Sequence, residues 1–409
     1  MNKFLSIIGP GLLVAATGIG AGDLATASFA GSYLGTTVLW AVAVGAFMKF
    51  VVTEGIARWQ LATGTTVLEG VVERLGPLFG WLFLAYLLFW SFFVGSALIS
   101  ACGVALHALI PIFEDARTGK VVFGILCSLA GWALVLAGGY SLFEKIMKVC
   151  IGFMFLTVLS TAAVLWPGME TVLVGLFVPT IPQAEESLGW TVALIGGVGG
   201  TVTVLCYGYW IREEGRDGPN EINNSRIDLA AAYLVTAVFG IAMVIIGSTI
   251  EIEGRGASLL VELSARLGES LGAVGKWAFL IGATGAVFSS LLGVWQAVPY
   301  LFADLWRLLM NRGDGTAVPD AVDTAAAPYR AYLAAIALVP MLGLFQDFRE
   351  VQKLYAVVGA WFLPALTLSL LILNGRGKRG NGSFPNQPLT VVDLVLILCF
   401  FSWVALRSF

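Results

Sequence analysis

Long apolar stretches separated by short polar ones dominate the pattern along this chain of 409 residues. A helix that crosses a bilayer needs about 20 mostly apolar residues. Judged by that length, the pattern predicts eleven membrane-spanning helices, at roughly 5–33, 35–58, 78–108, 120–138, 141–166, 188–211, 227–250, 272–304, 331–346, 354–374 and 390–408. We therefore expect an all-α membrane protein with one transmembrane domain over residues 1–409.

Two of the predicted spans contain a glycine cluster at mid-membrane depth. The first cluster is Gly18-Ile19-Gly20-Ala21-Gly22-Asp23, and the second is Gly196-Gly197-Val198-Gly199-Gly200-Thr201. Each glycine destabilises a helix by about 1 kcal/mol relative to alanine, so we expect both helices to unwind there. Unwound backbone in a membrane is tolerated where it is buried in protein or lines a cavity. Paired interruptions in two halves of a chain are typical of a transporter's binding site.

The predicted spans divide into two sets of five, at about 5–166 and 188–374, and 390–408 is an extra helix. Each set opens with an interrupted span, and an odd number of spans per set reverses its direction, so we expect inverted repeats. If the N-terminus is cytoplasmic, the inside segments hold 14 Lys and Arg residues and the outside segments hold 8. This distribution predicts a cytoplasmic N-terminus and an extracytoplasmic C-terminus in an inner or plasma membrane. Polar segments at 309–329 and 375–389 are expected to be mobile loops.

Composition excludes several classes of protein. Hydrophobic residues make up 58% of the chain and charged residues 12%, against about 25% charged in soluble domains. The net charge of −3 without a basic tract argues against a nucleic-acid partner. The single histidine, His107, and the isolated carboxylates argue against an enzyme, and we expect no cofactor. The absence of a phosphate-binding loop argues against an energy source built into the chain. The chain also lacks the repeated pore-lining strings that a channel would show. The lipid bilayer and a small inorganic ion are the expected partners, and a monomer is compatible with the sequence.

Several short stretches follow one another along the chain in a characteristic order. They are Gly9-Pro10-Gly11-Leu12-Leu13, residues 18–26, Trp40, Ala62-Thr63-Gly64, Gly199-Gly200-Thr201-Val202, Arg226-Ile227-Asp228, and Ser289-Ser290 with Gln296. In this order they resemble the Nramp family of divalent-metal transporters over nearly the whole chain. The resemblance implies a LeuT-type fold that works by alternating access, with the substrate at the breaks of the first and sixth spans.

The residues that bind metal in that family are replaced here. Where the family has Asp-Pro-Gly-Asn in the first span, this chain has Gly20-Ala21-Gly22-Asp23, and where it has Met-Pro-His-Asn in the sixth, this chain has Thr203-Val204-Leu205-Cys206. The acidic pair of the third span falls near Gly95 and Leu98, and the polar ligand of the tenth near Ala356. The resemblance therefore implies a conserved scaffold with a changed substrate.

The side chains that remain at the predicted breaks offer oxygen ligands only. Asp23, Thr201, Thr203 and the freed carbonyls of Gly18–Gly20 supply neither the imidazole nor the thioether that selects transition metals. A single carboxylate suits Na⁺ or a proton as the coupling species, and a Mg²⁺ ion that keeps several waters also fits. The two threonines can equally bond to carbonyls of the broken turn.

Backbone N–H groups at the two breaks suggest an anion as cargo. Helix N-termini carry a partial positive charge, and glycine lets an anion approach the backbone closely. Such termini are expected near Ala21–Asp23 and Thr201–Thr203, with Gly20, Gly22, Gly199 and Gly200 beside them. Our main prediction is a bicarbonate-like anion coupled to Na⁺ bound by Asp23. The alternative is a divalent cation (Mg²⁺, Mn²⁺ or Fe²⁺), with or without proton coupling.

Other polar residues in the predicted spans each have two interpretations. Asp23 is either a ligand or the N-cap of the helix that follows the break. Lys49 either supplies positive potential to the site, or is a lysine at the inner end of its span that extends to the membrane surface or is paired. Ser289, Ser290 and Gln296 either line a cation site or mediate helix packing.

Two further groups of residues are more simply explained by structural roles. Glu54 and Arg58 are spaced to pair with each other. Tyr207, Tyr209 and Trp210 are expected to pack, as an aromatic belt at the membrane interface.

Overall fold

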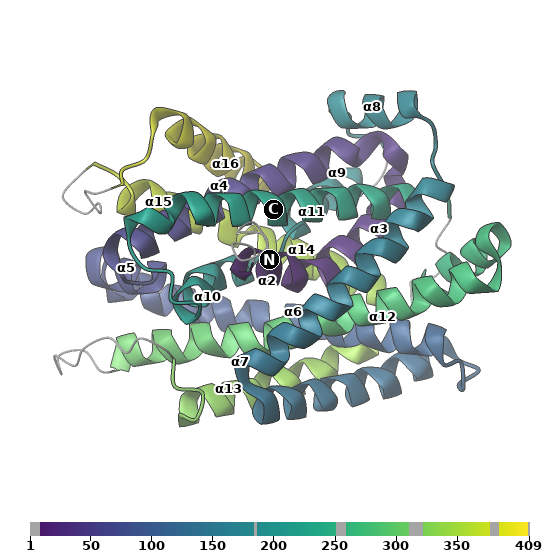
Figure 1. Ribbon diagram of the computed structural model, residues 1–409, viewed down its shortest axis with the longest axis horizontal. Helices are drawn as coiled ribbons and strands as arrows, with labels where there is room; N and C mark the ends of the chain where they lie inside the picture. The colour runs from purple at the N-terminus through teal and green to yellow at the C-terminus, as the bar shows by residue number, and fades with distance from the viewer. Residues whose placement is uncertain (1–8, 184–185, 251–258, 311–321, 377–383, 408–409) are drawn as a thin grey trace.

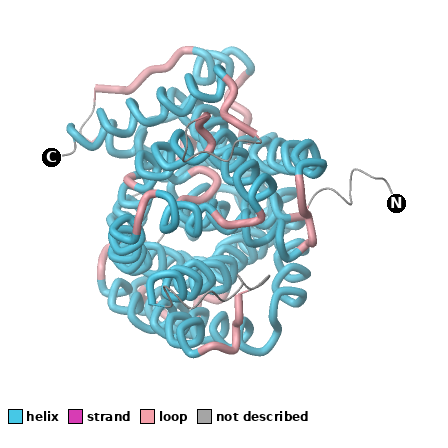
Figure 2. Tube along the Cα trace, turned by 90° about the vertical axis from the view of Figure 1, so that its left-hand side faces the viewer, coloured by secondary structure: helices cyan, strands magenta, loops and turns pink. Residues whose placement is uncertain are grey.

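The computed structural model describes residues 9–183, 186–250, 259–310, 322–376 and 384–407. Figure 2 shows helices joined by loops, and no strand occurs in these ranges. Up to residue 183 the elements are α2 (Pro10–Gly18), η1 (Ile19–Thr26), α3 (Ala27–Leu34), η2 (Gly35–Val38), α4 (Leu39–Thr63), α5 (Val67–Arg74), α6 (Pro77–Leu109), α7 (Ala116–Val164) and α8 (Met169–Phe177). From residue 186 they are α9 (Ser187–Gly197), η3 (Val202–Leu205), α10 (Cys206–Glu213), η4 (Pro219–Glu221), α11 (Ile222–Gly247), α12 (Leu259–Met310), α13 (Ala327–Leu338), η5 (Val339–Phe345), α14 (Phe348–Ala360), α15 (Phe362–Leu373) and α16 (Pro388–Arg407).

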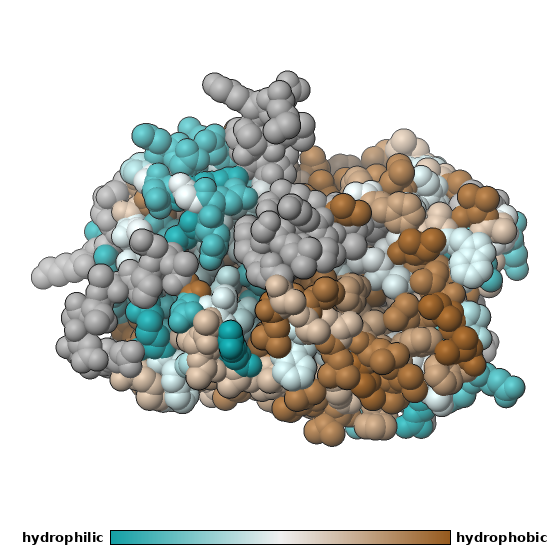
Figure 3. Space-filling view, turned by 60° about the horizontal axis from the view of Figure 1, so that its bottom comes forward, coloured by the Kyte–Doolittle hydropathy of each residue, from teal (hydrophilic) through white to brown (hydrophobic). Residues whose placement is uncertain are grey.

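The apolar helices of this fold are long enough to cross a membrane. In the described ranges eight of them pass that test by length and composition, or nine if the bent pair Phe155–Val164 and Met169–Phe177 is one span. Figure 3 shows a broad hydrophobic surface on one face, with hydrophilic residues gathered mainly toward one end. The predicted all-α membrane architecture is confirmed. The count of eleven spans is not confirmed, and the division into inverted repeats stays a prediction.

The fourth and fifth predicted spans form one continuous element, α7. The predicted end of the fourth span at residue 138 is therefore wrong, because the helix continues through Gly138 and Gly139. Two glycines lower the stability of a helix but do not break its hydrogen-bond ladder when packing supports it. Figure 1 shows that the two arms of α7 run in different directions, so the change of course happens within the helix.

Two short helices lie in segments that we expected to be connections. Helix α5 begins with a capping box in which Thr66 and Glu69 bond to each other's backbone N–H groups. The Thr-x-x-Glu spacing is a sequence signal for such a helix start, and it was available before the structure. Helix α8 follows Gly168, which adopts a positive φ of 103°.

Helix α12 contains the start of the eighth predicted span. Gly272 lies inside α12 with φ 68° and ψ −171°, so the helical path is interrupted there and resumes toward Met310. This interruption falls at the predicted boundary, residue 272. Figure 1 shows the long arm of α12 beside α6, and α6, α7 and α12 pack together.

The elements that carry the glycine clusters pack among the long helices. Helices α2 and η1 pack against α11 and α12, while α9 packs against α4 and α14. Three predicted features lie outside the described residues: the start of the first span at 5–8, most of the loop 309–329 at 311–321, and part of the loop 375–389 at 377–383.

Candidate ion-binding site

The sixth predicted span is interrupted at its glycine cluster, as we expected. Helix α9 ends at Gly197, and helical structure resumes only at Val202. Gly199 and Gly200 adopt φ values of 70° and 86°, a region that L-residues with a side chain avoid. A Cβ on Gly199 would lie 2.7 Å from Tyr233 Cε1 and one on Gly200 2.7 Å from Thr203 Oγ1. Both conformation and packing therefore require glycine at these positions.

The first predicted span does not unwind. Residues Ile19–Thr26 form the π-helix η1, which continues α2 into α3. A π turn accommodates extra residues with i→i+5 hydrogen bonds, so the glycine cluster widens this helix without ending it. The expected helix N-terminus at Ala21–Asp23 is therefore absent, and the freed carbonyls expected at Gly18–Gly20 belong to continuous helix.

The two glycine clusters meet in space. A Cβ on Gly18 would lie 2.4 Å from the backbone nitrogen of Gly200 and 2.6 Å from the carbonyl carbon of Gly199. Only a residue without a side chain permits this approach. The end of α2 thus rests directly on the interruption between α9 and η3.

Asp23 lies in η1 and binds that interruption. Its side chain is fully buried, and Oδ1 accepts a hydrogen bond from the N–H of Gly199 at 3.2 Å. Because Asp23 lies inside a helix, it is not the N-cap that we considered as its alternative role. The carboxylate instead satisfies a backbone donor that the break in the sixth span leaves without a helical partner.

Lys49 of α4 binds the same interruption from another side. Its ammonium donates to the carbonyl of Gly196 at 2.8 Å and to the carbonyl of Gly200. The residue is fully buried, so the interpretation that it extends to the membrane surface is wrong. Close packing of α4 on α9 makes the contact possible, since a Cβ on Gly45 would lie 2.7 Å from the carbonyl oxygen of Ile195.

Two threonine hydroxyls complete the polar surroundings of the break. Thr201 Oγ1 is buried next to Tyr355 of α14 but makes no hydrogen bond of normal length within the described chain. Thr203 is buried with its hydroxyl against Gly200. A hydroxyl oxygen offers two acceptor lone pairs, so Thr201 retains acceptor capacity for a ligand beside Tyr355.

Two of the three candidates on α12 have hydrogen bonds within that helix or to its neighbour α10. Gln296 Oε1 accepts a hydrogen bond from Trp210 Nε1 at 3.3 Å, and Ser289 donates to the carbonyl of Ala286 at 2.8 Å. Ser290 is buried in the same helix. The hydrogen bonds of Ser289 and Gln296 serve α12 and its packing on α10, which agrees with the packing interpretation.

Sequence reasoning missed part of this site. The carbonyl of Gly196 was not singled out, although the residue lies in the predicted cluster. The hydroxyls of Thr53 and Tyr233 bond to each other at 2.7 Å, and the Tyr233 ring packs against Gly199. No local signal identifies them, because their position depends on how α4 and α11 pack.

The aromatic residues of α10 are buried, which confirms that they pack, but they do not form the exposed belt of rings that we expected. Tyr207, Tyr209 and Trp210 are each at most 4% exposed. Tyr207 donates to Asp228 at 3.0 Å, and Tyr209 donates to Asp304. These carboxylate partners hold the two tyrosine hydroxyls inside the protein.

Asp228 ties the start of α2 to α11. Its carboxylate accepts the N–H groups of Gly9 and Gly11 at 3.1 and 2.8 Å, and Arg216 lies 3.6 Å away. Nearby, Glu54 accepts hydrogen bonds from Arg58 at 2.7 Å and from Arg226. The predicted pairing of Glu54 with Arg58 is confirmed.

A second ionic cluster joins α5, α10 and α12. Glu69 lies 3.4 Å from Arg212 and 3.1 Å from Arg307, and Arg307 also pairs with Asp304 at 2.7 Å. Burial of Glu69, together with the neighbouring Asp304 carboxylate, raises the pKa of the Glu69 carboxyl. This cluster holds three elements together at one end of the helices.

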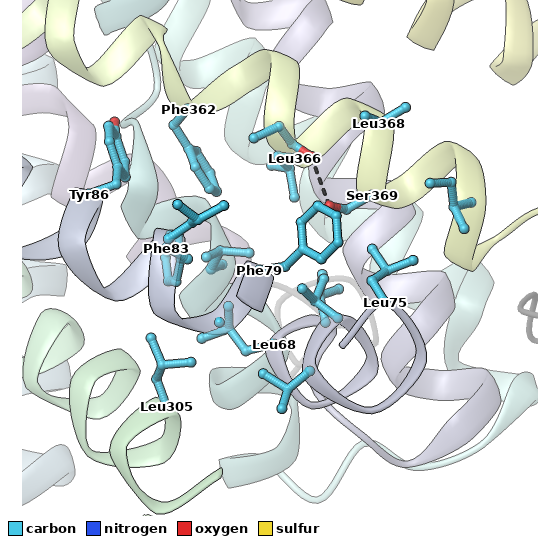
Figure 4. Close-up of a pocket in the computed structure, with 18 of the residues that line it drawn as sticks. Leu68, Leu75, Phe79, Phe83, Tyr86, Leu305, Phe362, Leu366, Leu368 and Ser369 are labelled. Atoms are coloured by element: carbon cyan, nitrogen blue, oxygen red, sulfur yellow. Dashed lines mark hydrogen bonds between the residues drawn. The ribbon is translucent and has the colours of Figure 1, made fainter. Parts of the chain in front are cut away.

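An apolar pocket of about 470 Å³ lies apart from the ion-binding site. Figure 4 shows Leu68, Phe79, Phe83, Phe362 and Leu366 around it, from α5, α6 and α15. Neither Asp23 nor Lys49 lines it, and the described residues that do line it carry no charged side chain to recognise an ion. We do not place the cargo there.

Solved transporter structures share this architecture. A manganese transporter variant from Eremococcus coleocola is 16% identical, with a TM-score of 0.75 and coverage of 99% of this chain and 87% of that chain. MhsT in complex with L-phenylalanine is 15% identical, with a TM-score of 0.63 and 98% coverage of both chains. MHP1, a nucleobase-cation-symport-1 transporter, is 14% identical, with a TM-score of 0.58 and coverage of 98% and 93%. The fold is therefore the LeuT-type fold of secondary transporters.

The family within that class is shown by the sequence itself. The family described as natural resistance-associated macrophage protein-like, or Nramp, matches residues 11–409, and the chain belongs to it. No curated protein sequence matches significantly. The chain is thus a membrane transporter and not an enzyme. Within the described ranges, however, no group of three or more His, Cys, Asp or Glu side chains can hold a metal ion.

Proposed function

We propose that this protein carries a small divalent metal cation, such as Mg²⁺ or Mn²⁺, by alternating access. Membership of the Nramp family carries this proposal. The break between α9 and η3 supports it with oxygen donors, namely the Asp23 carboxylate and the hydroxyls of Thr201 and Thr203. One carboxylate and two hydroxyls are too few to replace the whole hydration shell, so the cation keeps several waters, as Mg²⁺ does in proteins.

The bicarbonate-like anion of our main sequence prediction is the second candidate. Lys49 favours it, because a buried ammonium attracts anions. Two observations weaken it. The first span has no helix N-terminus at its glycine cluster, and the N–H of Gly199 is taken by Asp23. One expected helix N-terminus is therefore absent and one backbone donor is already in use, so we rank the divalent cation first.

Uptake into proteoliposomes tests this proposal. Purified protein is expected to carry Mn²⁺ or Mg²⁺ inward, as measured with an enclosed metal-sensitive dye, and Asp23→Asn is expected to reduce the rate at least tenfold. Glu73→Gln, an exposed carboxylate on α5, serves as the control and should transport normally. Uptake of labelled bicarbonate driven by a Na⁺ gradient, without metal uptake, would instead establish the second candidate.

The arrangement in the membrane belongs to the same proposal. We infer two inverted five-helix repeats, at about 5–166 and 188–374, with an extra helix at about 390–408. We place the N-terminus in the cytoplasm and the C-terminus outside an inner or plasma membrane. In this orientation the segments on the cytoplasmic side hold more Lys and Arg residues than those on the outside. Single-cysteine labelling of intact cells at Lys3 and Arg407 tests this orientation.

A further inference from the structure

The carbonyls of Gly196 and Gly200 lie at the interruption between α9 and η3. In broken membrane helices, carbonyls released at the break coordinate the cation that drives transport. In this protein an ammonium lies against both carbonyls, and it comes from Lys49 on a different helix, α4. An ammonium and an alkali cation carry the same single charge, and both bind to a cluster of carbonyl oxygens. Lys49 therefore makes the contacts that a bound Na⁺ or K⁺ would make.

The surrounding charges need no additional cation. Asp23 binds the same interruption through the N–H of Gly199 and carries the negative charge opposite Lys49. Both side chains are fully buried, and a buried charge without a counter-charge is strongly unfavourable. One carboxylate and one ammonium leave this segment neutral. A monovalent cation at the carbonyls of Gly196 and Gly200 would compete with the Lys49 ammonium for the same oxygens.

We propose that the Lys49 ammonium is a built-in substitute for a coupling cation at the break between α9 and η3. The intact protein then neither needs nor specifically binds Na⁺ at these carbonyls. Removing the ammonium turns the same carbonyls, with Asp23, into a site for a free monovalent cation. This inference does not depend on which divalent cation is the cargo.

Thermal unfolding of the purified protein tests the proposal directly. Lys49→Met and Lys49→Gln are compared with the unaltered protein in NaCl, KCl, methylammonium chloride and choline chloride at equal ionic strength. The unaltered protein should have the same melting temperature in all four salts. Both variants should melt lower in choline, and Na⁺, K⁺ or methylammonium should raise their melting temperature by several degrees in a saturable manner.

Lys120 provides a matched control. It is also buried and donates to a backbone carbonyl, that of Gln346 at 2.6 Å, but it lies far in sequence from the break. Lys120→Met should lose stability in every salt to the same extent, with no recovery by Na⁺ or methylammonium. Recovery confined to the Lys49 variants therefore distinguishes a cation site from a general effect of salt.

Three results would overturn the proposal. One is a specific stabilisation of the unaltered protein by Na⁺. Another is a folded Lys49→Met or Lys49→Gln variant that responds to no monovalent cation. The third is that neither variant can be purified in a folded state in any of these salts. A variant that can be purified folded in Na⁺ or K⁺ but not in choline supports the proposal. Because the readout is stability, failure to observe metal uptake would sink the proposed function and leave this inference intact.

Discussion

Asp23 and Lys49 satisfy opposite kinds of backbone group at the same interruption. The carboxylate accepts the Gly199 N–H, and the ammonium donates to the carbonyls of Gly196 and Gly200. Each unsatisfied backbone group at membrane depth costs several kcal/mol. The broken helix is thus stable because two side chains from other elements replace the hydrogen bonds that it lacks. These side chains are also each other's counter-charge.

A double-mutant cycle measures this coupling. Asp23→Asn is expected to destabilise the protein by about 3 kcal/mol, because it leaves the buried ammonium without a counter-charge. Lys49→Gln should have a similar effect, for the converse reason. The double variant should lose about 1–3 kcal/mol less than the sum of the two single losses. Thermal or denaturant unfolding in detergent, with choline as the only monovalent cation, gives the three values.

The same cycle with Lys120→Gln in place of Lys49→Gln supplies the reference. Its effects should add to those of Asp23→Asn, since Lys120 donates to the carbonyl of Gln346, beyond η5. Additive losses for Asp23 and Lys49 as well would mean that the two charges act independently.

The two glycine clusters differ at the level of the element, although their sequences are similar. One becomes a π-helix and the other a true break. Helix propensity predicts a weak point in both, and no more than that. The outcome depends on whether other side chains can bind the freed backbone groups. Such partners come from α4 and η1 for the sixth span, and sequence spacing does not reveal them.

Contacts between distant elements also explain the other differences between the sequence predictions and the structure. The sequence was sufficient for the all-α membrane class, the break in the sixth span, the boundary at Gly272 and the Glu54–Arg58 pair. It identified Asp23 and Lys49 because charges in apolar stretches stand out. It did not identify the targets of Lys49 or the inward contacts of Tyr207, because these depend on helix packing over long sequence distances.

Substitution of Gly199 tests the break as a conformational element. Gly199→Ala is expected to lower stability by about 2 kcal/mol or more, since it forces a left-handed conformation on alanine and brings a Cβ to 2.7 Å from Tyr233. Gly215→Ala is the control, because Gly215 has a φ of 66° but a Cβ added there would meet no other atom within 4 Å. The control should lose only the conformational part, about 1 kcal/mol. Equal losses in the two variants would show that close packing at the break is unimportant.

At the scale of the whole molecule, the Glu69 cluster links α5, α10 and α12. A carboxyl whose pKa is raised by folding binds its proton more tightly in the folded state than in the unfolded state. Stability then falls as the pH rises from the ordinary pKa of the carboxyl toward the raised one. Burial and the Asp304 carboxylate raise the pKa of Glu69 in this way from its ordinary value of 4.5.

We therefore expect the unaltered protein to lose stability relative to Glu69→Gln as the pH rises above about 4.5, since glutamine cannot ionise. Melting temperatures of both proteins, measured from pH 4 upward in one detergent, give this difference directly. Glu73→Gln alters an exposed carboxyl on the same helix, and its difference from the unaltered protein should stay nearly constant with pH. A stability difference for Glu69→Gln that moves in the opposite direction would mean that Arg212 and Arg307 outweigh burial and keep the carboxylate ionised. In that case the attraction between the Glu69 carboxylate and the two arginines would hold the three helices together.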